Sequence, residues 1–107
     1  MKIKKLQENV VTGEEVYATL HNKQENVSLS LNNTYTFTHQ GVGENIIILY
    51  TGSIEITNIT VDGNTILNTS IPVTSNPVIL PVDWSSSISI TIQATATANI
   101  FILYSGT

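Results

Sequence analysis

The sequence of 107 residues contains no cysteine, so it can form no disulfide and supports no thiol chemistry. Only 11% of its residues are charged, and after Lys23 it has no lysine or arginine. The remainder is mildly acidic, because five carboxylates follow Lys23: Glu25, Glu44, Glu55, Asp62 and Asp83. Such a surface repels a phosphate backbone, so we expect no nucleic-acid partner.

Long hydrophobic runs are also missing. The longest apolar runs are the five residues 46–50 and 100–104, whereas a membrane-spanning helix needs about 20. The opening MKIKKLQENVV has lysines but no apolar stretch behind them, which is not the pattern of a signal peptide. We therefore expect a protein that is made in the cytoplasm and has no membrane partner.

Motifs for catalysis and metal binding are lacking as well. There are two histidines, His21 and His39, no GxSxG motif and no carboxylate pair that the sequence singles out. The run 62–64 (Asp-Gly-Asn) matches part of a calcium loop but lacks the later oxygen ligands. We expect no enzyme, no catalytic residue, no metal site and no cofactor.

The residues that are present favour β-structure. Hydrophobic residues make up 41% of the chain, and Ile, Val, Thr, Ser and Asn are typical of strands and turns. Asp62-Gly63 predicts a type I′ hairpin turn, and Pro81 predicts an edge strand or a bulge. We predict one all-β domain over 1–107, a β-sandwich or jelly-roll-like barrel of about eight strands. The residues 20–26 are expected to be a polar connection, and strands are expected at 27–31, 34–39, 46–50, 54–61, 65–73, 78–82, 87–97 and 100–104.

The chain also contains an internal repeat. NIIILYTGS (45–53) matches NIFILYSGT (99–107). The residues 30–40 align with 83–93, and in this alignment Phe37 corresponds to Ile90. We interpret this as two tandem four-strand repeats, about 9–53 and 54–107, with 1–8 as an anchoring arm. The alternative is that two isoleucine-rich strands converged by chance.

The repeat predicts which side chains face the core. Strand side chains alternate, so Tyr35, Phe37 and His39 share a face opposite a row of threonines. His39 is therefore expected to be partly buried rather than a ligand. Trp84 aligns with Leu31, which favours a role in core packing over a sugar-stacking surface.

The two matching strands are apolar on both faces. In most antiparallel sandwiches one face of a strand meets water and is polar. The second apolar face here consists of Ile47, Leu49, Phe101 and Leu103. It needs a cover from the sister half, the N-terminal arm or another chain. Since lysine, which commonly protects sheet edges, is absent after position 23, we expect a homo-oligomer.

The opening KIKKL, followed by EEVYATLHNKQ, resembles the leader of many bacteriophage fibre and head- or baseplate-attached proteins. The body, rich in Ser, Thr, Asn and Ile, resembles phage decoration domains. The resemblance implies a non-enzymatic structural virion protein, an auxiliary capsid, decoration or fibre-attachment subunit that contacts other virion proteins. Its anchor would be the arm residues Lys2, Ile3, Lys4, Lys5 and Leu6.

Two other functions remain open at this point. A carbohydrate-binding β-sandwich would stack Trp84, Tyr17 or Tyr35 on a sugar and would need them exposed. A small inhibitor or adaptor that binds one host protein would share every feature of a structural subunit.

Overall fold

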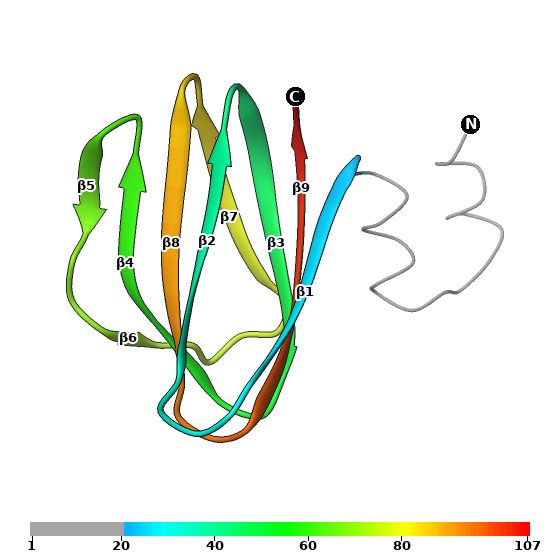
Figure 1. The fold of residues 1–107 in the computed structure, drawn as a ribbon, viewed down its shortest axis with the longest axis vertical. Coiled ribbons are helices and arrows are strands. Elements are labelled where there is room, and N and C mark those ends of the chain that lie inside the picture. Colours follow the sequence, from blue (N-terminus) through cyan, green and yellow to red (C-terminus); the bar gives the residue numbers. More distant parts are fainter. Residues whose placement is uncertain (1–20) are drawn as a thin grey trace, which may run out of the picture.

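The computed structural model describes residues 21–107 (Figure 1). The predicted arm, residues 1–8, lies outside these residues. The described part of the chain forms nine strands and no helix, arranged as two antiparallel sheets. The predicted all-β fold and its β-sandwich form are confirmed.

The strands divide between the sheets in a fixed order. The first sheet has the order β1-β9-β3-β7 and comprises β1 (Lys23–Leu29), β9 (Ala98–Gly106), β3 (Gly43–Thr51) and β7 (Val78–Trp84). The second sheet has the order β2-β8-β4-β5 and comprises β2 (Thr34–Gln40), β8 (Ser87–Ala94), β4 (Ile54–Val61) and β5 (Asn64–Leu67). The short β6 (Ile71–Pro72) also pairs with β4.

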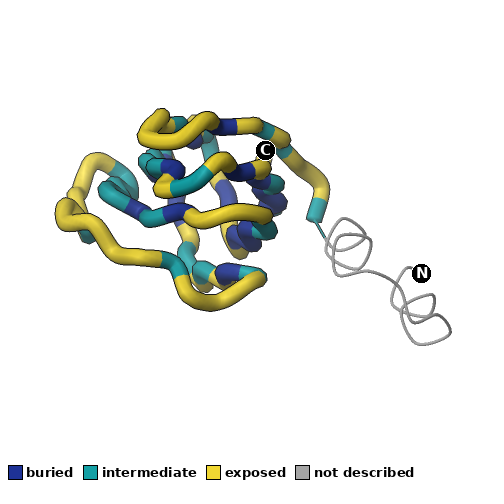
Figure 2. Tube along the Cα trace, turned by 90° about the horizontal axis from the view of Figure 1, so that it is seen from below, coloured by how far each residue is buried: buried dark blue, intermediate teal, exposed yellow. Residues whose placement is uncertain are grey.

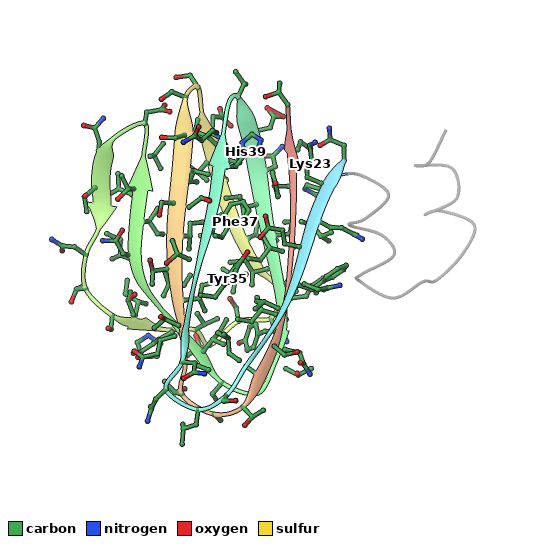
Figure 3. The ribbon with its side chains drawn as sticks, in the orientation of Figure 1. Lys23, Tyr35, Phe37 and His39 are labelled. Atoms are coloured by element: carbon green, nitrogen blue, oxygen red, sulfur yellow. The ribbon has the colours of Figure 1, made fainter. Side chains whose placement is uncertain are left out.

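The core lies between the two sheets, where Figure 2 shows the buried positions gathered. Every second residue of β8 is buried, which is the period of two that a strand with one inward face requires. On β2, Phe37 is fully buried while Tyr35 and His39 are partly buried, and all three follow one another along the strand in Figure 3. The predicted inward face of β2 and the predicted state of His39 are confirmed.

The pairing of the repeated strands has a two-fold pattern. In the second sheet, β2 pairs with β8 so that Phe37 lies opposite Ile90. In the first sheet, β3 pairs with β9 so that Ile48 lies opposite Ile102. Both pairs join residues that the internal repeat treats as equivalent. A duplicated unit that pairs with its own copy about a two-fold axis gives this register.

The two halves nevertheless differ in detail. Trp84 is 2% exposed, as predicted for a core residue, whereas its counterpart Leu31 is 55% exposed in the turn after β1. Asn45 has a positive φ of 60° at a bulge in β3, while Asn99 lies in regular pairing with Thr51. The structural correspondence between the two halves therefore covers the repeated strands but not their ends.

Two strand predictions need correction. The residues 23–26, expected in a polar connection, begin β1, because their backbone pairs with β9 while most of their side chains face solvent. The predicted strand 65–73 is divided into β5 and β6, which both pair with β4. The first prediction was wrong because residues 23–26 are polar and were therefore assigned to a connection. An edge strand with an exposed face needs few apolar residues.

The turn predictions hold. Asp62 and Gly63 have φ values of 51° and 82°, which is the type I′ geometry that joins β4 to β5. Pro81 lies on β7, an edge of the first sheet, where no second neighbouring strand needs its missing N–H.

Gly43 gives a test of the core. It lies opposite Trp84 in the β3–β7 pairing, and a Cβ at this position would collide with the six-membered ring of the indole. We expect Gly43→Ala to lower the free energy of unfolding by about 1–3 kcal/mol, because the buried ring must shift. Urea unfolding followed by far-ultraviolet circular dichroism measures this cost.

The matched control repeats the substitution in a Trp84→Phe background. The atoms nearest to the added methyl belong to the part of the indole that phenylalanine lacks. The cost of Gly43→Ala should therefore shrink there, and an equal cost in both backgrounds would contradict the collision.

Candidate functional site

The outward side chains of β3 and β9 meet in the first sheet. Ile47 pairs directly with Leu103, and Leu49 pairs with Phe101. On the neighbouring strand β7, Ile79 lies opposite Ile47 and continues the row. We call these five residues the outer apolar strip: Ile47, Leu49, Ile79, Phe101 and Leu103.

The exposure of the strip varies along it. Ile47 and Leu103 are 6% and 0% exposed, although neither belongs to the core cluster between the sheets. Leu49 and Phe101 are partly buried, and Ile79 is 58% exposed. The strip therefore presents open apolar surface at Ile79 and at the Leu49–Phe101 pair, which is the signature of an interaction surface.

Two depressions adjoin the strip. One has a volume of about 320 Å³ and lies around Ile47 and Ile79, with His21 and Asn45 in its lining. The other, about 440 Å³, lies around Leu49 and Phe101. The outer face of the first sheet is thus hollowed at both ends of the strip.

The structure brings together the four predicted interface residues of β3 and β9 as two adjacent cross-strand pairs. The predicted anchor, Lys2 to Leu6, lies outside the described residues. Sequence reasoning missed Ile79, although a signal was present. In the run VILPV (78–82), alternation puts Ile79 on the face opposite Val78 and Leu80.

Trp84 and Tyr35, the two proposed sugar-stacking residues that the structure describes, do not form an exposed platform. Trp84 is 2% exposed and donates a hydrogen bond from Nε1 to Nδ1 of His39 at 2.9 Å. The His39 and Trp84 rings also meet edge to face. The prediction that Trp84 packs in the core is therefore confirmed, and Trp84 as a sugar-stacking platform is wrong.

Tyr35 is held in a similar way. Its hydroxyl donates to Oε1 of Glu25. This hydrogen bond joins β2, an edge strand of the second sheet, to β1, an edge strand of the first sheet. Burial, together with this hydrogen bond and the charge of Glu25, raises the pKa of Tyr35 to about 12. Tyr35 is thus partly buried and engaged with a carboxylate, and Tyr17 lies outside the described residues.

Within residues 21–107, no group of three or more His, Asp or Glu side chains could hold a metal ion. The same part of the chain has no helix whose length and apolar character would let it cross a membrane.

The carboxylate of Asp62 is the acceptor at the centre of a cluster of hydrogen bonds. Its carboxylate accepts hydrogen bonds from the backbone N–H groups of Ser85, Ser86 and Ser87, at 2.7–3.1 Å. These bonds, led by that of Ser86, hold the pKa of Asp62 far below its usual range. The β4–β5 turn thereby fixes the turn between β7 and β8, which links the two sheets.

No protein-family model matches the chain, and no curated protein matches its sequence.

The Asp62 cluster predicts a pH-dependent stability. Because the folded-state pKa is lowered, the carboxylate stabilises the fold above its unfolded pKa of about 3.9 and loses this effect as the pH falls below that value. We expect Asp62→Asn to lower the melting temperature by a few degrees at neutral pH. The difference from the wild type should narrow as the pH falls from 4 to 2, about the range below the unfolded pKa.

The matched control is Asp83→Asn, which changes an exposed carboxylate that makes no side-chain hydrogen bond with residues 21–107. Thermal unfolding followed by circular dichroism at several pH values measures both variants. A difference between wild type and Asp62→Asn that stays constant with pH would exclude the charged form of Asp62 as the stabilising species.

Proposed function

We propose that this protein is a non-enzymatic structural subunit that assembles through the outer face of its first sheet. The outer apolar strip is the observation that carries the proposal. Its five apolar side chains form two adjacent cross-strand rows on β7, β3 and β9, and Ile79 at the end of one row is 58% exposed. A partner chain that covers the strip removes this apolar surface from water, which favours association.

An unprotected strand edge also supports assembly. Several described strands have residues that protect a sheet edge. These residues are Lys23 and Glu25 on β1, Pro81 on β7 and Pro72 on β6. By contrast β2 is a seven-residue edge strand without lysine, carboxylate or proline. Natural monomers seldom leave such an edge uncovered. The uncovered edge of β2 therefore favours a chain that is a subunit of a homo-oligomer or of a larger particle.

The finer part of the proposal concerns the particle. The leader KIKKL followed by EEVYATLHNKQ resembles those of bacteriophage fibre- and head-attached proteins. We place this chain in the same class, as an auxiliary capsid, decoration or fibre-attachment subunit of a virion. Residues Lys2 to Leu6 would contact another virion protein while the sandwich decorates or bridges. Mass spectrometry of purified particles should then detect the chain, and its absence from them would rule out this part of the proposal.

Assembly through the strip is tested by Ile79→Glu. We expect the wild type to elute as an oligomer above the 11.6 kDa of one chain. The variant should dissociate at concentrations about a hundredfold higher than the wild type, because an unpaired carboxylate would be buried in the interface. Size-exclusion chromatography with light scattering over a concentration series measures both.

The matched control is Val42→Glu, since Val42 has a similar exposed fraction, 56%, in the turn between β2 and β3. It should leave the oligomer intact. A wild type that stays monomeric over the whole concentration series would refute assembly through this face, and so would equal dissociation of the two variants.

A further inference from the structure

Beyond the Leu49–Phe101 pair, the outer face of the first sheet changes from apolar to polar. Cross-strand pairing places Asn26 beside Phe101, which in turn lies beside Leu49. The next row consists of Ser28, Asn99 and Thr51 on the same three strands, β1, β9 and β3. One aromatic ring is therefore bordered on two sides by amide and hydroxyl groups.

These rows line the larger depression on this face. Its volume is about 440 Å³, which is within the usual range for small-molecule sites. Asn76, from the loop between β6 and β7, adds a third asparagine to the lining. We call this depression the asparagine cleft. Its lining includes Asn26, Ser28, Asn76, Asn99 and Phe101.

Two of the three amides are held in place by the fold. Ser28 Oγ donates to Oδ1 of Asn99 at 2.6 Å, so the amide nitrogen of Asn99 is left to donate. Nδ2 of Asn76 donates to the carbonyl of Tyr50 at 2.7 Å, so its amide oxygen is left to accept. The exposed side chain of Asn26 makes no hydrogen bond with residues 21–107. Because the side chains of Asn99 and Asn76 are already fixed, less side-chain entropy of the protein is lost when a ligand binds.

The chemistry of the lining selects a class of ligand. Among the described residues, no charged side chain lines the cleft, so this lining offers no ion pair to a phosphate, a carboxylate or an ammonium group. Amides and hydroxyls donate and accept hydrogen bonds, as do the neighbouring hydroxyls of a sugar ring. An aromatic ring offers an electron-rich face to the C–H groups of the same sugar.

We propose that the asparagine cleft binds a neutral saccharide. Phe101 contacts the apolar face of the sugar ring, and the amides of Asn99, Asn76 and Asn26 bind its hydroxyl groups. A carbohydrate-binding module was expected to use Trp84, Tyr17 or Tyr35. The proposed site uses Phe101 as its aromatic residue instead. The proposal does not require assembly through the outer apolar strip, although Phe101 belongs to both the strip and the cleft.

The test uses saturation-transfer difference NMR on the full chain. The probes are the methyl glycosides of glucose, galactose, mannose and N-acetylglucosamine, each at about 5 mM, a concentration that detects dissociation constants near 1 mM. Glucuronate, sialic acid and the neutral peptide trialanine serve as contrasting ligands. We expect saturation transfer to at least one neutral glycoside, and weaker or no transfer to the charged sugars and the peptide.

Variants then locate the site. Phe101→Leu keeps an apolar side chain but removes the ring, and Asn99→Ala removes an amide; each should weaken binding about tenfold. Asn26→Ala changes an exposed side chain that makes no hydrogen bond with residues 21–107, so it tests the cleft without disturbing the fold. Thr65→Ala on β5, in the second sheet, is the control and should bind like the wild type.

Melting temperatures show whether each variant is folded, and Asn26→Ala keeps the test valid if Phe101→Leu or Asn99→Ala is not. Absence of saturation transfer to all four neutral glycosides would overturn the proposal. Stronger transfer to the charged sugars or to trialanine would overturn it too, as would unchanged saccharide binding in Asn26→Ala and in every folded variant of Phe101 and Asn99.

Discussion

The antiparallel pairing of β3 with β9 determines most of what this structure can do. These two strands occupy the middle of the first sheet, with β1 and β7 on either side. Their inward residues, such as Ile48 and Ile102, are buried in the core, and their outward residues form the centre of the outer apolar strip. Because side chains alternate along a strand, one register sets both faces at once, and a shift of one residue would exchange them.

The two outer faces of the sandwich differ for the same reason. On the second sheet, β2 and β8 alternate apolar residues with threonine and serine, so the outer face of these two strands presents hydroxyl groups, and Thr36 and Thr91 lie within hydrogen-bond distance of one another. On the first sheet, β3 and β9 have apolar residues in both directions. A polar outer face is stable in water, whereas an apolar one gains free energy from a cover. The first sheet is therefore the side on which contacts with other molecules are expected.

Local sequence patterns predicted much of the fold. Alternation gave most strands, Asp62-Gly63 gave the type I′ turn, and the repeat aligned Phe37 with Ile90, its partner in the sheet. The start of β1 was missed because an edge strand with polar side chains has the composition of a loop. The asparagine cleft could not be predicted, since Asn26, Asn76 and Asn99 lie far apart in the sequence and only the pairing of β1 with β9 and the path of the β6–β7 loop bring them to one place.

The strip and the cleft share a boundary, and this has a thermodynamic consequence. Leu49 and Phe101 belong to the outer apolar strip and also line the asparagine cleft. A partner that covers only the Ile79 end leaves the cleft open at the rim of the interface, whereas one that covers the whole strip closes it. If contact with a partner changes the affinity of the cleft for a ligand, the ligand must change the affinity for that partner by the same factor. The proposed assembly and the proposed ligand binding on this face would therefore be coupled unless the partner stops short of Phe101.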